Sequence, residues 1–202
     1  MRLYCSPASP FVRMVMVALH ETGLIGQVEI VTASGTAINP GTLPVSQNPA
    51  GKIPTLERPD GPALYDSRVI SRYLDSLAGG TLYPNEPGLW EALTLEATAH
   101  GMTEAAVLMV YEGRCREPEE RSEKWVEAQW LKVARSLDAL EARWISHLSG
   151  PPGAAQIATG CALGYLDYRH SDRAWRNGRP ALARWEAEFS ARPSMQATAP
   201  AS

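Results

Sequence analysis

Residues 48–56 constrain the fold of this chain more than any other stretch, and they read Asn-Pro-Ala-Gly-Lys-Ile-Pro-Thr-Leu. Gly51 permits backbone angles that other residues avoid, and Ile53-Pro54 then opens a short apolar run. Because proline has no backbone N–H, it suits the first residue of a strand. X-Pro bonds are also the ones that adopt the cis form at modest cost. A cis Pro54 would turn the N–H and C=O of Ile53 outward, where an extended peptide could pair with them.

A second strand and a helix start follow this stretch. Residues 57–62 are a turn by composition, and Ala63-Leu64-Tyr65 reads as a short strand. Asp66-Ser67 then precedes an apolar face at helical spacing, made of Val69, Ile70, Tyr73, Leu74 and Leu77. A helix N-terminus has unpaired N–H groups and suits a carboxylate. Each motif alone is common, but their order and spacing together indicate a site for a peptide-like ligand with a free carboxylate.

Composition and charge narrow the class of protein. The chain has 202 residues, of which 45% are hydrophobic and 20% charged, with a formal net charge of −3. This length allows one large domain or two small ones, and the charge gives no electrostatic reason to bind nucleic acid or acidic membranes. No apolar run reaches the ~18–20 residues of a membrane span, and residues 1–5 lack a signal-peptide pattern. We therefore expect a soluble, cytoplasmic protein with no nucleic-acid or membrane partner.

The cysteines and histidines argue against metal and disulfide chemistry. Cys5, Cys115 and Cys161 are odd in number, far apart and without a Cys-x-x-Cys pair, so neither a disulfide framework nor a two-cysteine redox motif is expected. The four histidines are scattered without the spacing of metal ligands. We expect reduced thiols and no metal site.

The first 77 residues read as a βαβ unit, a loop and a ββα unit. Residues 2–5 form the first expected strand, and Ser9 before Pro10 predicts a helix that runs to Gly23. Residues 27–31 form the next strand, and residues 32–47 form a loop rich in Gly, Pro, Ser and Thr. The pattern predicts an α/β domain over residues 1–77.

Residues 78–87 are the best linker candidate, because glycines and prolines gather there. After them the pattern is helical, with expected helices over 89–111, 119–147 and 155–168 and a short one around 182–189. The third of these is apolar nearly all round, which is typical of a helix buried in the middle of its domain. We therefore expect an all-helical domain over residues 88–202.

The chain resembles the soluble glutathione transferases, closest to bacterial members with a serine at the first helix. Five motifs carry the resemblance: Ser9-Pro10-Phe11-Val12-Arg13, Asn48-Pro-Ala-Gly-Lys-Ile-Pro54, Asp66-Ser67 with Ile70 and Tyr73-Leu74, Gly164-Tyr165-Leu166-Asp167, and Arg192-Pro193-Ser194. The resemblance implies a thioredoxin-like domain followed by a helical bundle. It also implies a detoxifying transferase that is a homodimer, takes glutathione as co-substrate without a tightly bound cofactor, and acts on a small hydrophobic electrophile.

The resemblance assigns roles to particular residues. The backbone of Ile53, beside Pro54, would pair with the cysteinyl part of glutathione, next to Phe11. Ser67 would hold the γ-glutamyl carboxylate, with Asp66 facing the ammonium group. The glycyl end would be held by Lys52 or by the loop over residues 36–43. The family usually starts its buried helix with Ser or Thr and has Asp three residues on, whereas this chain has Gly153 and Gln156, which still provide a weaker cap.

Thiol activation has one leading candidate and open alternatives. A glutathione thiol, like a free cysteine, has a pKa near ~8.5, and transfer needs the thiolate. Ser9, at the start of the first helix, can donate a hydrogen bond to it, although Ser9 could serve only as a helix cap. Cys5 and Ser6 are also near, and we expect Cys5 to be a core residue.

Two residues are candidates for the second-substrate cleft, and two other functions stay open. His100 and Tyr111 lie on the helix that borders this cleft in the family, although core or dimer packing would explain such residues equally. A non-catalytic or weakly catalytic glutathione-fold binding or regulatory protein is one alternative. A glutathione-dependent thiol-disulfide reductase is another, and it would need a reachable Cys5.

Overall fold

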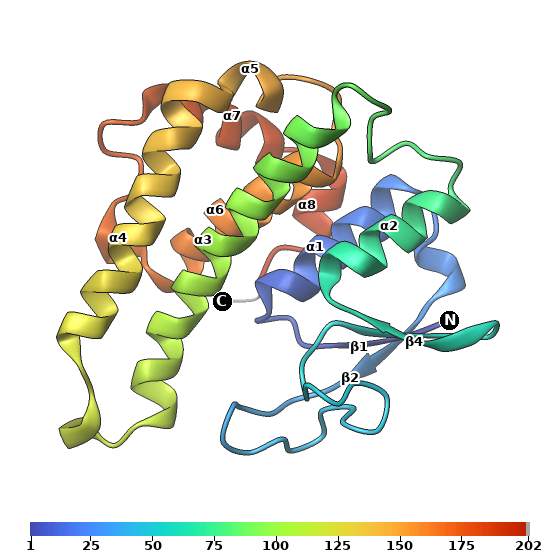
Figure 1. The fold of residues 1–202 in the computed structure, drawn as a ribbon, viewed down its shortest axis with the longest axis horizontal. Helices are drawn as coiled ribbons and strands as arrows, with labels where there is room; N and C mark the ends of the chain where they lie inside the picture. The colour runs from blue at the N-terminus through green and yellow to red at the C-terminus, as the bar shows by residue number, and fades with distance from the viewer. Residues whose placement is uncertain (201–202) are drawn as a thin grey trace.

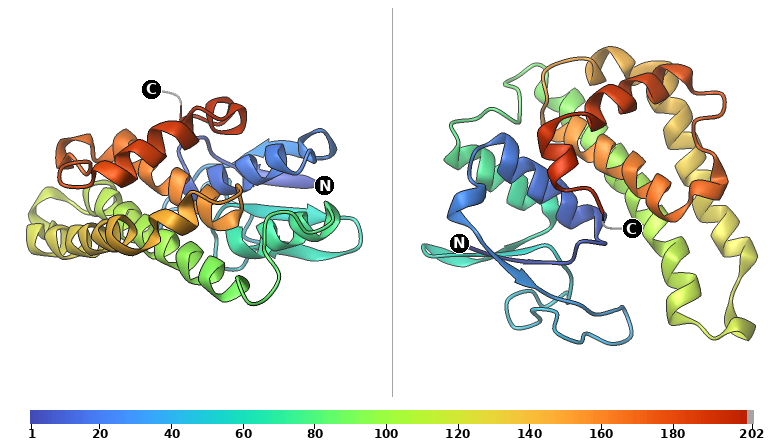
Figure 2. Two further views of the ribbon diagram at one scale, coloured as in Figure 1. Left: turned by 90° about the horizontal axis from the view of Figure 1, so that it is seen from above. Right: turned by 180° about the vertical axis from the view of Figure 1, so that it is seen from behind.

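The computed structural model describes residues 1–200 of the chain. Its two parts lie side by side: a sheet with α1 and α2 on one face, and a group of helices (Figure 1). Turning the molecule shows that α1 lies between the sheet and the C-terminal helices (Figure 2). This is a thioredoxin-like N-terminal domain joined to an all-helical C-terminal domain, as the sequence predicted.

The N-terminal part contains a four-stranded mixed sheet in the order β2-β1-β3-β4. Its elements are β1 (Arg2–Cys5), α1 (Pro10–Glu21), a 3₁₀ turn (Ile25–Gln27), β2 (Glu29–Thr32), β3 (Thr55–Arg58), β4 (Gly61–Tyr65) and α2 (Ser67–Leu77). β1 pairs with β2 in parallel, which confirms the predicted crossover. β3 is antiparallel to both β1 and β4, with Leu3 opposite Leu56.

The helical part is longer and more divided than the sequence predicted. Its elements are α3 (Leu89–Cys115), a 3₁₀ turn (Pro118–Glu120), α4 (Glu123–Ala139), a π-helical turn (Leu140–Trp144), α5 (Ile145–Leu148), α6 (Ala154–Arg169), a 3₁₀ turn (Ser171–Arg173), α7 (Pro180–Ser190) and α8 (Pro193–Ala197). The helix expected from residue 119 begins at Glu123, because Ser122 caps it by accepting a bond from the Trp125 N–H at 3.2 Å. The segment after Arg192 lies beyond the last helix expected from the sequence, and it forms α8, with Pro193 in its first turn.

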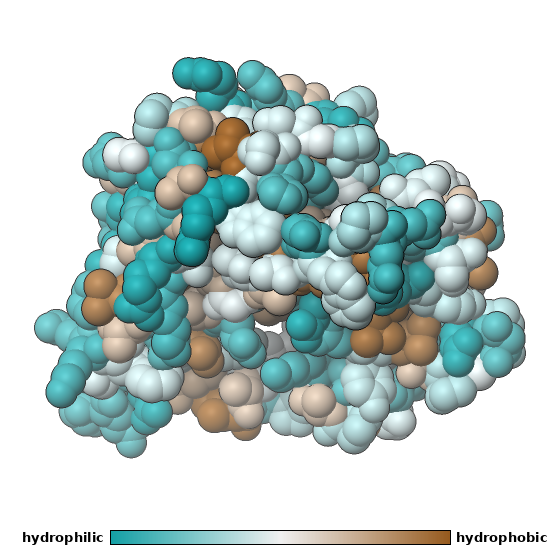
Figure 3. All heavy atoms as spheres, turned by 45° about the horizontal axis from the view of Figure 1, so that its top comes forward, coloured by the Kyte–Doolittle hydropathy of each residue, from teal (hydrophilic) through white to brown (hydrophobic). Residues whose placement is uncertain are grey.

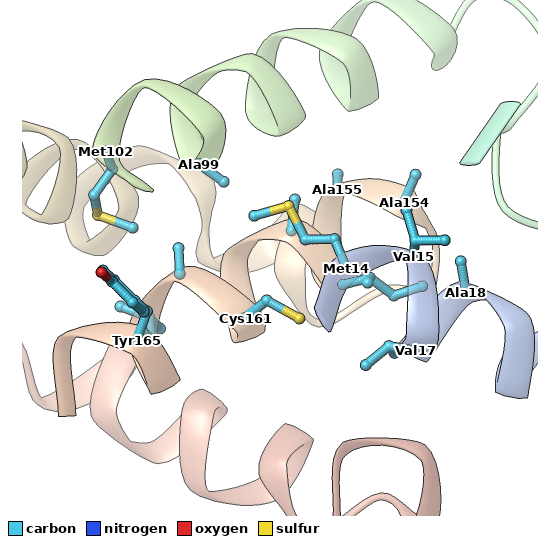
Figure 4. Close-up of a cluster of buried hydrophobic side chains, with 14 of the residues drawn as sticks. Met14, Val15, Val17, Ala18, Ala99, Met102, Ala154, Ala155, Cys161 and Tyr165 are labelled. Atoms are coloured by element: carbon cyan, nitrogen blue, oxygen red, sulfur yellow. The ribbon is translucent and has the colours of Figure 1, made fainter. Parts of the chain in front are cut away.

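α6 lies at the centre of the helical part and is buried along most of its length. It packs against α3 on one side and against α1 of the sheet domain on the other. In Figure 4, Cys161 of α6 points toward α1, and Met102 of α3 lies across from Tyr165. A single core therefore runs through both parts of the molecule.

The glycine at the start of α6, where the family usually has Ser or Thr, has a steric reason. Gly153 donates its N–H to Gln156 Oε1 at 3.1 Å, so the weaker cap expected from the sequence is formed. A Cβ added at Gly153 would lie 2.6 Å from the Leu82 carbonyl oxygen. That same oxygen accepts the Ala154 N–H at 2.9 Å. The segment before α3 therefore leaves no room for a serine or threonine cap.

The segment between α2 and α3 is held from both sides. The Asp75 carboxylate of α2 accepts the N–H groups of Thr81 and Leu82, each at 2.6 Å. Further on, the Tyr83 hydroxyl donates to the buried Glu96 of α3 at 2.8 Å. Over residues 1–200, none of the helices is long and apolar enough to cross a membrane.

Candidate functional site

The turn before β3 presents an unpaired backbone edge. The Ile53-Pro54 peptide bond is cis, and Gly51 has a φ of +59°. Asn48, only 2% exposed, fastens this turn from inside: its amide donates to the Lys52 carbonyl at 2.9 Å and to Thr55 Oγ1 at 3.3 Å. Within residues 1–200, the N–H and C=O of Ile53 have no hydrogen-bond partner. They are free to pair with an extended ligand.

The N-terminus of α2 lies beside this edge, because Tyr65 at the end of β4 pairs with Thr55 of β3. Asp66 caps α2 by accepting the Arg68 N–H at 2.9 Å, with a φ of 68° that is uncommon outside glycine. Ser67 is only 3% exposed, and its hydroxyl bonds to none of the described residues. The free hydroxyl and the first N–H groups of α2 together form a site suited to a carboxylate.

Arg68 determines the charge of this site, and the sequence reasoning missed it. Its guanidinium donates two hydrogen bonds to the Asp66 carboxylate, from Nε to Oδ1 at 3.1 Å and from Nη2 to Oδ2 at 2.9 Å. These bonds lower the pKa of Asp66, against the opposing effect of its partial burial. Asp66 is therefore an anion at neutral pH and can face an ammonium group. The adjacency of Asp and Arg was the only signal in the sequence.

Ser9 stands at the first turn of α1, where the sequence placed it. Its Oγ accepts the Val12 N–H at 3.3 Å, and Pro10 is the first helical residue. Because the oxygen acts as the acceptor, the hydroxyl proton stays available for a second bond. Capping and donation to a ligand are therefore compatible, and the structure leaves both roles open for Ser9.

The cysteines offer no reactive thiol at this site. Cys5 is 8% exposed at the end of β1, and burial raises its pKa. Burial also raises the pKa of Cys161 in α6 to about 12. Cys115 is half-buried at the far end of α3. A thiol needs to ionise to attack, so the disulfide-exchange alternative gains no support from Cys5.

His100 of α3 joins the site from the helical domain. Its ring lies against Phe11 of α1, with ring centroids 5.5 Å apart. Burial, and then the positive charge of Arg68, lower the pKa of His100 to about 4, so the ring is neutral at neutral pH. The structure thus brings Phe11, Asp66, Arg68 and His100 together. Tyr111 lies ~16 Å further along α3, at a rise of 1.5 Å per residue. It is close enough to Tyr165 of α6 to contribute to the raised pKa of that residue.

Figure 3 shows a hollow in the molecular surface between the two parts of the molecule. Lys52 lies on the sheet side of the site; it is exposed and is the only basic side chain from residue 33 to residue 57. No group of His, Cys, Asp and Glu among residues 1–200 could hold a metal ion.

A thioredoxin-like domain with a cis proline and a helix tip suited to a carboxylate, joined to a helical bundle, defines the class of two-domain transferase folds. Comparison with protein families agrees. Residues 8–77 match the family described as glutathione S-transferase, N-terminal domain, and residues 123–188 match the corresponding C-terminal domain. The chain is 30% identical to the GST-like protein YibF of Escherichia coli, over 99% of this chain and 98% of that protein. The chain belongs to the glutathione transferase family of enzymes.

Solved structures of relatives are similar to this chain over its whole length. A glutathione transferase family member from Pseudomonas fluorescens Pf-5, with bound glutathione, is 45% identical with a TM-score of 0.96 and covers 100% of this chain and 99% of its own. A second structure from the same source holds S-(propanoic acid)-glutathione, with a TM-score of 0.91. A glutathione S-transferase from Methylobacillus flagellatus, with glutathione bound, is 34% identical over 99% of both chains, with a TM-score of 0.83. The likeness is therefore to bacterial members and extends over both domains.

Proposed function

We propose that this protein binds glutathione and activates its thiol for attack on a small hydrophobic electrophile. The observation that carries the proposal is the unpaired backbone edge of Ile53, set beside the free hydroxyl of Ser67 at the tip of α2. One extended tripeptide with a terminal carboxylate can form hydrogen bonds with both the Ile53 backbone and the Ser67 hydroxyl. The glutathione-bound relative at 45% identity supports this choice of ligand.

Each part of glutathione has a partner of suitable chemistry. The cysteinyl N–H and C=O pair with the backbone of Ile53, beside Pro54. The γ-glutamyl carboxylate accepts bonds from Ser67 and the N–H groups of α2, and its ammonium faces the ionised Asp66. The glycyl carboxylate pairs with Lys52, since the loop over residues 33–47 contains no cation.

Ser9 is the proposed thiol-activating group. Its hydroxyl donates to the glutathione sulfur while its oxygen keeps the Val12 cap. Lowering a thiol pKa by one unit needs only ~1.4 kcal/mol of preference for the thiolate. A charge-assisted hydrogen bond and the positive end of α1 can supply that. The thiolate then attacks an electrophilic carbon, and the leaving group departs with the electron pair of the broken bond.

The second substrate lies on the α3 side of the thiol. Phe11 and the neutral ring of His100 form an apolar wall there. Tyr111 lies ~16 Å further along α3 and would line only the far end of the cleft. The conjugate S-(propanoic acid)-glutathione in a relative's structure supports the idea that a thioether product fits such a site. We infer a small electrophile with a hydrophobic portion, as expected of a detoxifying enzyme.

The proposal also covers the domain boundaries, the oligomeric state and the location of the protein in the cell. Residues 1–77 form the glutathione-binding domain, residues 78–87 the linker and residues 88–202 the helical domain. A cytoplasmic homodimer is the proposed state of the protein. Exposed apolar side chains on β4, α2 and α3 support a partner surface, and they are Tyr65, Val69, Leu77 and Trp90.

Two measurements test the proposal. Calorimetry should show glutathione binding that Ser67→Ala weakens about tenfold, and a generic aryl halide should be conjugated in the presence of glutathione. Ser76→Ala, near the other end of α2, is the matched control and should bind as the wild type does. Binding without conjugation would favour the regulatory alternative, and absence of binding would contradict the proposal.

A further inference from the structure

Arg13 is a buried cation in α1, one helical turn beyond Ser9. It is 9% exposed, and its Nη2 donates to the Met195 carbonyl of α8 at 3.1 Å. Its Nε is buried without a hydrogen-bond partner. No carboxylate pairs with it within residues 1–200, whereas the exposed Arg68 and the half-buried Arg192 both have acidic partners.

Helix α6 leaves room for the Arg13 guanidinium at one glycine. A Cβ added at Gly164 of α6 would clash with Nη1 of Arg13, so only glycine fits there without movement. One turn earlier on α6, Cys161 lies in the field of Arg13, which opposes the effect of burial on the thiol pKa. The described groups that face Arg13 from α6 and α8 are therefore a glycine backbone, a neutral thiol and a carbonyl.

Such an arrangement costs folding free energy, which favours a functional role for the charge. Burying a cation forfeits its hydration, and no carboxylate offsets that loss here. The field of a buried charge is also poorly screened by solvent and salt. The nearest functional group along α1 is Ser9, whose carbonyl accepts the Arg13 N–H at 3.0 Å. Ser9 and Arg13 are also one turn apart on the same face of α1, and helical side chains lean toward the helix N-terminus, so the charge lies on the side of the helix end where the proposed thiolate forms.

We propose that Arg13 is an electrostatic positioning residue whose buried charge lowers the pKa of the glutathione thiol at the start of α1. This rests on the proposed function, and it adds to Ser9 a second source of thiolate stabilisation that touches no substrate. The other charged groups of the site are Asp66 and Arg68 of α2, which pair with each other, and Lys52, whose charge is offset by the glycyl carboxylate of glutathione in the proposed complex. His100 of α3 is neutral. Arg13 is the one cation of this set whose charge is not offset.

Two substitutions of Arg13 separate the effect of its charge from the effect of its size. Arg13→Met keeps the bulk and removes the charge, whereas Arg13→Lys keeps the charge. The pKa of the bound glutathione thiol is read from the ultraviolet absorbance of the thiolate during a pH titration. We expect the Met variant to raise it by about 0.5–1 unit, which is a three- to tenfold loss of thiolate at neutral pH. The Lys variant should stay within a few tenths of a unit of the wild type. Glutathione affinity below the thiol pKa should change little in either variant.

Arg192→Met is the matched control, because Arg192 ties α8 to the other end of α1 through Glu21. It should lower the melting temperature and leave the thiol pKa unchanged. Arg13→Gln replaces the Met variant if that protein does not fold. A neutral Arg13 variant with the wild-type thiol pKa overturns the inference, as does an equal shift in Arg13→Lys or Arg192→Met. If the wild type itself binds no glutathione, the proposed function fails instead.

Discussion

The side-chain amide of Asn48 donates to the Lys52 carbonyl at 2.9 Å and closes the turn that carries Ile53 and Pro54. Asn48 also accepts the Ala50 N–H at 3.0 Å, so one buried side chain fixes both arms of the turn. The backbone edge of Ile53 is thus held in place by a residue that is itself buried.

Asn48→Ala should lower the free energy of unfolding by about 1–3 kcal/mol, because it leaves buried polar groups without partners. Urea denaturation measures this loss, and glutathione affinity should fall with it, since the turn loses its internal support. Asn39→Ala is the control. Asn39 accepts the Gly41 N–H in an exposed loop, so its loss should cost less than about 1 kcal/mol. Equal effects of the two substitutions would contradict the role given to Asn48.

Ser9→Ala should raise the pKa of the bound glutathione thiol by about one unit, because the thiolate loses a charge-assisted donor. It should also cost about 1 kcal/mol of stability through the lost cap on Val12. Ultraviolet titration of the complex and thermal unfolding measure the two effects separately. Ser6→Ala, three residues earlier, should change neither. A loss of stability with an unchanged thiol pKa would mean that Ser9 is only a cap.

His100 should make the protein less stable in mild acid. Its pKa is lowered to about 4 in the folded state, against ~6.5 in the unfolded chain. Between these values the unfolded chain binds the proton more readily, so stability falls as pH drops from about 6.5 toward 4. The expected loss by pH 5 is about 1–2 kcal/mol. Urea denaturation at pH 7 and pH 5 should show this loss to be smaller in His100→Gln. A variant with the same pH dependence as the wild type would exclude His100 as the cause.

Gly153→Ser should destabilise the protein by about 1–3 kcal/mol, although serine is the better helix cap. The added Cβ would lie 2.6 Å from the Leu82 carbonyl oxygen. Gly101→Ala is the matched control, because nothing lies within 4 Å of its added Cβ in the middle of α3. That substitution should instead stabilise the helix by roughly 0.5–1 kcal/mol. Thermal unfolding of both variants checks the opposite signs.

The features predictable from the sequence were those encoded by neighbouring residues. The β-α-β order of the first elements, the cap at Ser9 and the burial of α6 all follow from local chemistry. Local chemistry allows the cis peptide before Pro54 without requiring it. The resemblance to a known family supplied the roles of the site residues.

What the sequence did not reveal depends on contacts between distant segments. The burial of Arg13 requires α8, which lies more than 180 positions away. The steric need for Gly153 requires Leu82. The approach of His100 to Phe11 requires the docking of one domain on the other. No pattern within a window of ten or twenty residues contains such information.

The Leu82 carbonyl ties the connecting segment to the first N–H of α6, and the Asp75 carboxylate ties the same segment to α2. Opening the molecule like a hinge would break both attachments at once. These two attachments oppose a change in the angle between the domains. We therefore expect the proposed substrate cleft to accommodate new substrates by exchange of the side chains on its walls. Evolution of specificity in this scaffold is expected to proceed by point substitutions along α1 and α3, with the span between the domains left untouched.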